Sequence, residues 1–140
     1  MDRRERFLMS KTKILLSIHP EFVDKIVKGE KTVEYRKVLP KGRIEKIVIY
    51  ATYPVQKVVA EAEFKGYIIS FPNVVWNMTK DIGGVSKEQF DSYYRNNREC
   101  IVFRLGKVTV YNNPKTLDEL GLENAPQSFV YLEDDEKELN

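Results

Sequence analysis

The sequence predicts one α+β domain, a small β-barrel of mixed or antiparallel strands with helices inserted between them and flanking them. Segments rich in β-branched residues outnumber segments that have the helical period. The two longest strand segments each contain an internal glycine, Gly66 or Gly106, which permits the sharp bend that curls a sheet into a barrel. A chain of 140 residues can form one core that buries about two-thirds of its unfolded surface.

The first half of the chain predicts short strands around one helix. Residues 13–18, with the sequence KILLSI, form a buried strand. A helix then begins at Pro20, which suits a first turn, and ends at Gly29 in a left-handed cap. Its apolar side chains share one helical face: Phe22, Val23, Ile26 and Val27. Two further strands are predicted at residues 32–36 and 46–52.

The second half predicts two long strands and a pair of helices. Residues 56–69 alternate between apolar and polar side chains, as a strand with one buried face does. The dipeptide Gly83-Gly84 separates two helices, at residues 71–84 and 86–96. The second helix opens with a capping-box pattern, made by Ser86 and Gln89. Two aromatic side chains of the first are expected in the core: Phe71 and Trp76. A strand, a short helix and a last strand follow: residues 99–111, 116–121 and 126–132.

The composition excludes several classes of protein. No apolar run approaches the roughly 20 residues of a membrane span, and the N-terminal segment lacks the apolar stretch of a secretory signal. The single Cys100 excludes an internal disulfide, and one Cys with one His cannot build the usual zinc site. We therefore expect a cytoplasmic protein with no membrane partner, no metal and no cofactor.

The charge is distributed unevenly along the chain. We divide the sequence into a basic leader (residues 1–12), a globular domain (residues 13–132) and an acidic tail (residues 133–140). The tail holds five acids and one base, which leaves 22 bases and 16 acids, a net charge of +6, in residues 1–132. This excess favours anionic partners, although it is far from the basic stripe of a dedicated DNA-binding protein.

The stretch GEKTVEYR, residues 29–36, concentrates charge at the junction of the predicted helix and strand. Because side chains alternate along a strand, Glu34 and Arg36 share one face, about 6.5–7 Å apart. Lys31 follows the helix cap directly and can turn toward both. A guanidinium suits a phosphate or a base edge, a carboxylate accepts from an amine, and a desolvated ammonium serves as base or nucleophile. The alternative is a solvated strand with surface ion pairs, worth only about 0–1 kcal/mol each.

GEKTVEYRK resembles the Gly-x-Lys-x-x-Glu-x-Arg signature of the ASCH domain family, a relative of the PUA fold. The similarity covers Lys13 to Leu132 and includes, in order, ILLSIHPEFVDKIVKGEKTVEYRKVLPKG, IVIYATYPV and PQSFVYL. The resemblance implies a PUA-like β-barrel with a cleft beside the first helix, lined by the motif. It also implies RNA or nucleotide-like ligands, by kinship with RNA-binding PUA domains. Some members of the family are similar to regulators, some are ribonucleases, and some hydrolyse an amide on an acetylated cytidine.

The amidohydrolase members carry Lys-x-x-Thr in this motif and a further Glu on a later strand. The corresponding residues here are Lys31 and Glu34, so this chain departs from that pattern at the second position. By strand order, the later carboxylate would be Glu61 or Glu63.

Four further residues are expected beside the cleft: His19, Thr52, Gln127 and Ser128. His19 precedes the helix and either contacts a ligand there or only caps the helix. Thr52 either binds phosphate or caps the turn after its strand. The amide of Gln127 and the hydroxyl of Ser128 either read base edges or pin the last strand.

Aromatic and basic residues also alternate near the end of the second inserted helix: Tyr93, Tyr94, Arg95 and Arg98. Such a cluster can stack single-stranded bases, and the alternative is one core tyrosine beside one surface tyrosine.

Three functions remain open from the sequence. The favoured one is an RNA- or nucleotide-binding module in which Lys31, Glu34 and Arg36 contact the ligand. The second is a hydrolase acting on a modified nucleoside or on RNA, with Lys31 and Glu34 as catalytic residues. The third is a structural role for Glu34 and Arg36, with function carried by protein partners.

Overall fold

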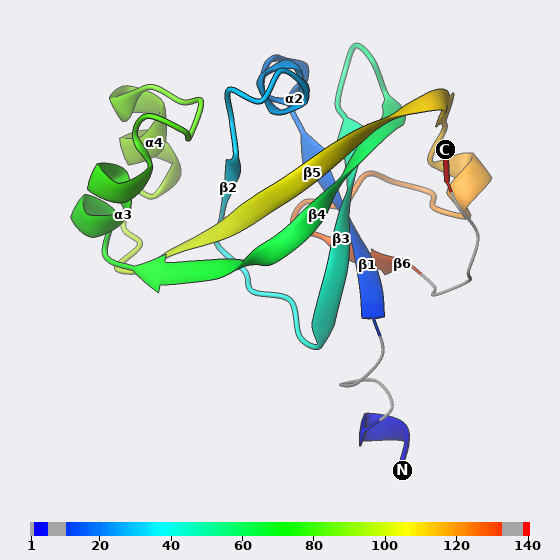
Figure 1. The fold of residues 1–140 in the computed structure, drawn as a ribbon, viewed down its shortest axis with the longest axis horizontal. Coiled ribbons are helices and arrows are strands. Elements are labelled where there is room, and N and C mark those ends of the chain that lie inside the picture. Colours follow the sequence, from blue (N-terminus) through cyan, green and yellow to red (C-terminus); the bar gives the residue numbers. More distant parts are fainter. Residues whose placement is uncertain (1, 6–10, 133–138) are drawn as a thin grey trace.

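The computed structural model describes residues 2–5, 11–132 and 139–140. Its core element is one six-stranded sheet with the order β2-β5-β4-β3-β1-β6 (Figure 1). The strands are β1 (Lys11–Ile18), β2 (Val33–Arg36), β3 (Arg43–Ala51), β4 (Lys57–Ser70), β5 (Cys100–Lys115) and β6 (Val130–Leu132). The helices are α2 (Pro20–Val27), α3 (Pro72–Thr79), α4 (Lys87–Tyr93) and the 3₁₀ turn η1 (Asp118–Leu120).

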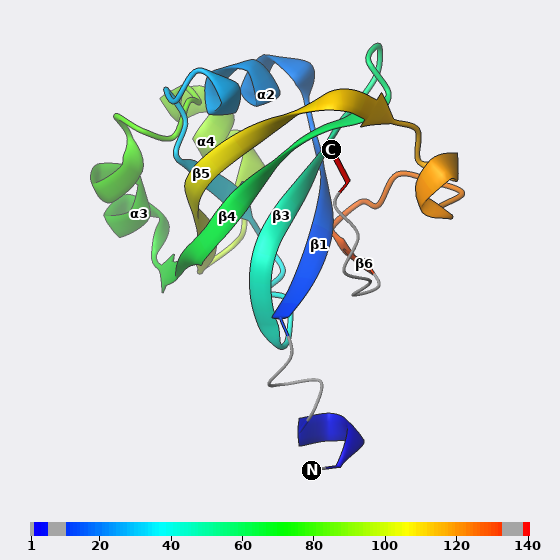
Figure 2. The same ribbon diagram turned by 45° about the vertical axis from the view of Figure 1, so that its right-hand side comes forward.

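Strand pairing in the sheet is mixed. β1 runs parallel to β3, and the pairs β1–β6, β2–β5, β3–β4 and β4–β5 are antiparallel. The long strands β4 and β5 sweep across the curved sheet, while α3 and α4 lie together on one side of it and α2 lies at one end (Figures 1 and 2). The predicted α+β class with mixed strands and inserted helices is confirmed.

The bend predicted in the long strands lies at Gly66. The β4–β5 register shifts between Phe64 and Tyr67, and Gly66 adopts a φ of 110°, which L side chains rarely adopt. On β5, Gly106 lies near Glu63 of β4, and a Cβ added to it would lie 3.0 Å from Glu63 Cβ. The glycines therefore serve a bulge and a close approach of two strands.

Two apolar clusters place the inserted helices and α2. Inside the sheet, Val23 and Ile26 of α2 pack against β1, β3 and Phe103 of β5. A second cluster joins β2 to the inserted helices, with Val33 and Tyr35 packed against Val75, Phe90 and Tyr94. Edge strand β2 is therefore held by its pairing with β5 and by its packing against α3 and the α4 segment.

Two expectations need correction or refinement. Phe71 was expected in the core, but 56% of its surface is exposed, because it precedes the first turn of α3 and only Val75 and Thr79 of that helix are buried. Trp76 packs against Phe90 at a ring-centroid distance of 5.2 Å, as expected of a core contact. The short helix expected before Gly121 is a 3₁₀ turn.

The ends of the chain overlap the expected boundaries. Residues 3–5 are helical and β1 begins at Lys11, within the segment assigned to the leader. The rest of that leader, and residues 133–138 of the acidic tail, lie outside the described residues. Within the described ranges, no helix is long and apolar enough to cross a membrane.

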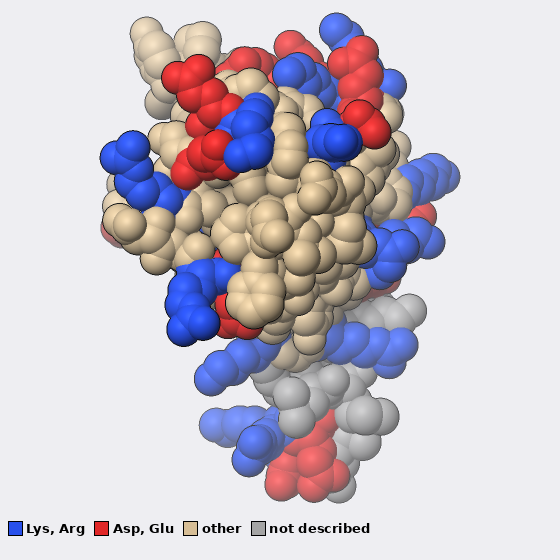
Figure 3. All heavy atoms as spheres, turned by 90° about the vertical axis from the view of Figure 1, so that its left-hand side faces the viewer, with Lys and Arg blue, Asp and Glu red and all other residues tan. Residues whose placement is uncertain are grey.

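The face formed by α3 and the end of β4 is largely uncharged at its centre. Uncharged atoms fill the middle of this face, and Lys and Arg side chains stand mostly at its margin (Figure 3). Five apolar side chains of β4, of α3 and of the residue between them are exposed: Tyr67, Ile69, Phe71, Val74 and Met78. This face therefore lacks a continuous basic surface.

Candidate functional site

The turn between α2 and β2 brings Lys31 into the protein. Gly29 has a φ of 80° and ends the helix, as predicted. The amides of Glu30 and Lys31 then donate to the carbonyl of Lys25, at 2.9 and 3.1 Å. These bonds turn the chain so that Lys31, which is 1% exposed, points inward just before β2 begins.

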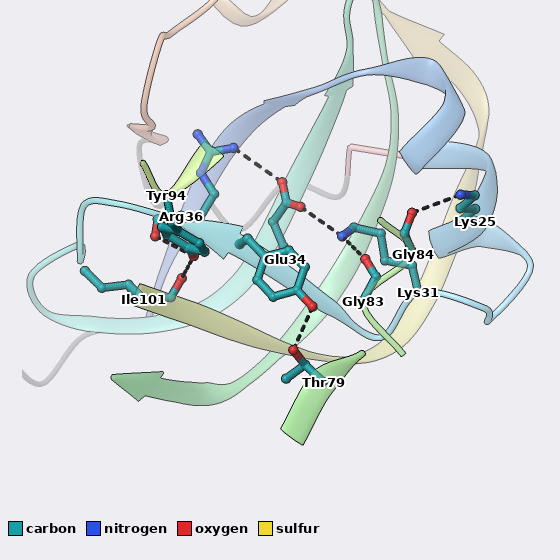
Figure 4. A network of polar contacts seen from close by, with 10 residues as sticks. Lys25, Lys31, Glu34, Arg36, Thr79, Gly83, Gly84, Tyr94 and Ile101 are labelled. Atoms are coloured by element: carbon teal, nitrogen blue, oxygen red, sulfur yellow. Dashed lines mark hydrogen bonds and ion pairs between the residues drawn. The ribbon is translucent and has the colours of Figure 1, made fainter. Parts of the chain in front are cut away.

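Three charged side chains of the motif meet in one row (Figure 4). Lys31 Nζ lies 3.5 Å from Glu34 Oε1, and Arg36 Nη1 lies 3.3 Å from Glu34 Oε2. Glu34 thus bridges an ammonium and a guanidinium, as the sequence predicted from their spacing. A solvated surface strand does not describe this arrangement, because Lys31 and Glu34 are both buried.

Arg36 also links the two edges of the sheet. Its Nη2 donates to the backbone carbonyl of Ser128, at 2.5 Å. Arg36 ends edge strand β2, and Ser128 precedes the opposite edge strand β6. One guanidinium therefore holds both edges together across the open side of the barrel.

A loop between α3 and α4 forms the second wall around Lys31. Three successive carbonyls of this loop accept hydrogen bonds from the α2–β2 junction: Ile82 O from Thr32 N at 2.9 Å, Gly83 O from Lys31 Nζ at 2.5 Å, and Gly84 O from Lys25 Nζ at 2.9 Å. The loop lies some fifty residues away in sequence, and these three bonds fix it against Lys31 (Figure 4).

The two glycines of this loop allow its close approach. A Cβ on Gly83 would lie 1.9 Å from the hydroxyl of Tyr35, and a Cβ on Gly84 would lie 3.0 Å from Cβ of Lys31. The sequence indicated only a break between two helices at this point. The glycine pair is the one signal in the sequence, because glycine permits both a turn and a close approach of the backbone to other atoms.

The charged row lines a pocket of about 710 Å³, a size typical of sites for small organic ligands. The pocket lies between the end of β1, α2, β2 and α4. Aromatic side chains from both helices and from β2 contribute to its wall: Phe22, Tyr35, Phe90 and Tyr93. Its charged lining residues are Lys31, Arg36, Glu21, Glu34 and Glu88.

Burial changes the acid–base properties of the pocket. Desolvation lowers the pKa of Lys31, and the neighbouring charge of Lys25 acts in the same direction, while the Coulomb attraction and hydrogen bond of Glu34 oppose it. The ammonium lies 4.9 Å from the Tyr35 ring centroid and 5.5 Å from that of Phe22. Lys31 therefore combines a weakened hold on its proton with a fixed position.

The two tyrosines in the wall ionise less readily than free tyrosine. Desolvation raises the pKa of Tyr35, with Thr79 as hydrogen-bond partner, and it also raises the pKa of Tyr93. Both rings remain neutral near pH 7, so they present apolar faces to a ligand.

The other four candidates divide into pocket residues and supports. His19 and Gln127 line the pocket. Thr52 and Ser128 lie outside that lining. The Thr52 hydroxyl is 3.3 Å from Nδ1 of the lining residue His19, and the backbone carbonyl of Ser128 accepts a hydrogen bond from Arg36. Ser128 was proposed for its hydroxyl, whereas the contact found uses a group that every residue carries.

The later carboxylate proposed for an amidohydrolase is not in the pocket. Glu61 is buried elsewhere, paired with Lys46 at 2.6 Å, and accepts a hydrogen bond from the Tyr111 hydroxyl at 3.0 Å. Glu63 pairs with Lys65 at 3.4 Å on the surface. Glu21 of α2 and Glu88 of α4 line the pocket instead. Neither residue belongs to the motif or to a strand, so the sequence did not indicate them as site residues.

The tyrosine pair splits as one of the two alternatives predicted. Tyr94 is buried and its hydroxyl donates to the carbonyls of Arg36 and Ile101, at 3.0 and 2.9 Å. Tyr93 lines the pocket, is 38% exposed and has Lys37 Nζ 4.5 Å from its ring centroid. Arg95 and Arg98 are exposed and lie outside the pocket lining.

A metal ion in a protein is bound by a cluster of ligating side chains. Across the ranges 2–5, 11–132 and 139–140, no three His, Cys, Asp or Glu side chains group closely enough to hold one.

Comparison with known proteins gives relatives over most of the chain. The ASCH domain-containing ribonuclease of Zymomonas mobilis is 31% identical over 127 residues, which covers 87% of this chain and 85% of that protein. The crystal structure of ASCH from Zymomonas mobilis matches with a TM-score of 0.80 at 29% identity, covering 87% of this chain and 88% of that one.

Two curated relatives from Ureaplasma parvum are longer proteins. Its ATP synthase subunit alpha is 30% identical over 125 residues, and its large ribosomal subunit protein uL22 is 29% identical over 103 residues. This chain spans 16% and 33% of their lengths, respectively. The ASCH domain profile matches residues 16–133, which include the whole charged row. The chain therefore belongs to the ASCH domain family.

Proposed function

We propose that this protein binds RNA, with one nucleotide seated in the pocket between the sheet and helices α2 and α4. The observation that carries the proposal is the convergence of Lys31, Glu34 and Arg36 in one pocket of nucleotide size. The ribonuclease relative, similar over 85% of its own length, supports RNA as the ligand.

The chemistry of the lining suits a nucleotide better than a bare anion. Three carboxylates and two cations line the pocket, so it offers both acceptors and donors. A base with exocyclic amines can donate to carboxylates, while Arg36 retains donors that its two described contacts leave for a phosphate or a base edge. Tyr93 and Phe22 supply faces for base stacking, which is worth about 1–3 kcal/mol per base.

The modest net charge favours a short single strand. Residues 1–132 carry a net charge of only +6, and the face of α3 and the end of β4 is uncharged at its centre (Figure 3), whereas long duplexes require an extended basic surface. Single-stranded bases can instead be splayed into a pocket and read on their edges.

The binding test uses a short, unstructured 2′-O-methyl RNA, which cannot be cleaved through its 2′ oxygen, and fluorescence anisotropy. Arg36→Gln should weaken binding roughly 10–100-fold, as loss of a charge-assisted hydrogen bond of about 1.5–3 kcal/mol does. The matched control is Arg43→Gln, because Arg43 is exposed at the start of β3 and outside the pocket lining.

Because Arg36 also joins the sheet edges, Glu34→Gln serves as a second pocket variant and thermal melts accompany both. Equal affinity of the pocket variants and the control, with all of them folded, would refute binding in this pocket.

RNA cleavage is a second candidate function, favoured by the ribonuclease relative and by the burial of Lys31 beside Glu34. Glu34 would accept the proton of a ribose 2′-hydroxyl as its oxygen attacks the adjacent phosphorus. The bond from phosphorus to the 5′ oxygen would break, and the Lys31 ammonium would give its proton to that oxygen. Arg36 would stabilise the charge that develops on the phosphoryl oxygens. The products would be a 2′,3′-cyclic phosphate and a 5′-hydroxyl.

Cleavage is tested with unmodified RNA of the same sequence, and the products are weighed by mass spectrometry. Lys31→Met keeps the volume of the buried stem and removes the proton donor, so turnover should be lost, whereas binding of 2′-O-methyl RNA should weaken, as it does for the other pocket variants, but remain measurable. If the unaltered protein binds RNA but forms no cyclic-phosphate product, the result supports the binding function and excludes this cleavage reaction.

A further inference from the structure

We propose that Lys25, which lies outside the pocket lining, is a positioning residue that holds the Gly83–Gly84 loop against Lys31 and sets a second positive charge beside it. The expected effect of Lys25 on RNA binding rests on the function proposed above, whereas its expected effect on the titration of Lys31 does not.

Lys25 is tied to Lys31 through the backbone and through the loop. The carbonyl of Lys25 accepts from the amide of Lys31 at 3.1 Å, while its ammonium donates to Gly84 O at 2.9 Å. The Lys31 ammonium donates to the neighbouring carbonyl, Gly83 O. The two lysines thus donate to adjacent carbonyls of one loop (Figure 4). Because the two carbonyls are neighbours in the chain, a displacement of one also displaces the other.

The loop has little freedom once both lysines are in place. Gly84 adopts a φ of 68°, and a Cβ added to it would lie 3.0–3.2 Å from the side-chain carbons of Lys31. Without the Lys25 ammonium, Gly84 O would lose its hydrogen bond to a lysine. The adjacent Gly83 carbonyl, which accepts from Lys31, would then be held less firmly in place. A hydrogen bond from a charged donor is about twice as strong as a neutral one, so this anchor is a substantial part of the loop's attachment.

The charged and titratable groups that face Lys31 come from all three packed elements. From β2, Glu34 pairs with it and the Tyr35 ring lies beside it; from α2 come Lys25 and the Phe22 ring; the loop contributes the Gly83 carbonyl. Burial lowers the pKa of Lys31, Glu34 raises it, and the charge of Lys25 acts in the same direction as burial with a smaller effect. A second cation beside a desolvated lysine is one way in which proteins activate a lysine amine.

The test follows Lys31 directly by NMR in the full chain, labelled with ¹³C at lysine Cε and assigned with Lys31→Met. Lys25→Met keeps the aliphatic stem and removes the charge and the donor, so the titration midpoint of Lys31 should rise. Lys25→Arg keeps a charged donor and should leave the midpoint close to that of the unaltered protein. Lys28→Met is the matched control, because Lys28 is exposed at the end of the same helix.

The same variants are then measured with 2′-O-methyl RNA. Lys25→Met should weaken binding roughly tenfold, the effect of losing about 1.4 kcal/mol, while Lys25→Arg and Lys28→Met stay within about twofold. Weaker binding without a shifted Lys31 titration would reduce Lys25 to a structural role and overturn the proposal. So would a Lys25→Met protein that matches Lys28→Met in both measurements. If the unaltered protein binds no RNA, the proposed function fails and the Lys31 titration still decides the role of Lys25.

Discussion

Replacing Gly83 by alanine tests how tightly the loop packs on the pocket wall. The φ of Gly83 lies outside the positive range, so alanine is permitted by the backbone and the effect is steric. The added Cβ would lie 1.9 Å from Tyr35 Oη and 2.7 Å from Cζ, and Tyr35 is enclosed by the rings of Phe90 and Tyr94, at 5.2 and 6.1 Å. Tyr35 or the loop must therefore move.

The cost can be worked from the contacts that would break. Thr79 Oγ1 donates to Val75 O at 2.7 Å, so in its 2.7 Å contact with Tyr35 the tyrosine hydroxyl is the donor. Displacing the ring loses this buried bond, about 1 kcal/mol, and overpacking adds about 1–3 kcal/mol. We expect Gly83→Ala to lower the free energy of unfolding by about 2–4 kcal/mol.

The assay is urea denaturation followed by circular dichroism, arranged as a double-mutant cycle with Tyr35→Phe. The phenylalanine removes the atom that clashes most, so Gly83→Ala should cost less in that background, by about 1–2 kcal/mol. Gly29→Ala is the contrasting control: its φ is 80° with no atom within 4 Å, so its cost of about 1 kcal/mol is conformational and should add to that of Tyr35→Phe. A Gly83→Ala protein destabilised by under about 0.5 kcal/mol, or a cycle without coupling, would refute this packing.

Three further predictions concern stability and reactivity. Ser86→Ala should destabilise the protein by about 1 kcal/mol, seen as a lower melting temperature, because it removes the oxygen that accepts from Gln89 N at 3.0 Å; Ser86→Gly should cost only a few tenths. Cys100 is fully buried, and burial raises its pKa to about 11. A thiol reagent at pH 8 should therefore modify it only as fast as the protein unfolds, and far more slowly than it modifies a free thiol; rapid modification of the folded protein would contradict this. Between the lowered pKa of Lys31 and the usual 10.5, the unfolded chain binds more protons at this lysine than the folded one, so Lys31 contributes a rise of the unfolding free energy with pH, which the raised pKa values of Tyr35, Tyr93 and Cys100 oppose; Lys31→Met should remove that contribution and make the slope of unfolding free energy against pH more negative in this window.

The sequence predicted the elements whose physics is local. The α2 helix follows from Pro20, its apolar face and Gly29, and the capping box at Ser86 is present with both of its bonds. The meeting of Glu34 with Arg36 follows from strand alternation, and that of Lys31 from its place after the helix cap. These patterns depend on neighbours within a few residues, which a sequence displays directly.

The parts that could not be predicted depend on contacts between distant segments. Nothing local says that Gly83 O receives the Lys31 ammonium, or that Arg36 reaches a backbone carbonyl 92 residues away. Every residue has a backbone carbonyl, so a sequence gives no indication of which carbonyl forms a contact. The sequence therefore indicated that Ser128 lies near the site but not that its carbonyl makes the contact. Glu61 illustrates the converse, since a carboxylate chosen by strand order is satisfied by Lys46 and Tyr111 away from the pocket.

The bond from Arg36 to the Ser128 carbonyl has a consequence for how the chain responds to an occupant of the pocket. The same guanidinium joins the two sheet edges and lines the pocket, so a ligand that binds its remaining donors and shifts its position also alters the bond to the Ser128 carbonyl. By thermodynamic reciprocity, a change in the free energy of that bond caused by the ligand is matched by an equal change in ligand affinity when the bond is broken. Ligand binding in the pocket and the attachment of the C-terminal segment would then form one coupled equilibrium.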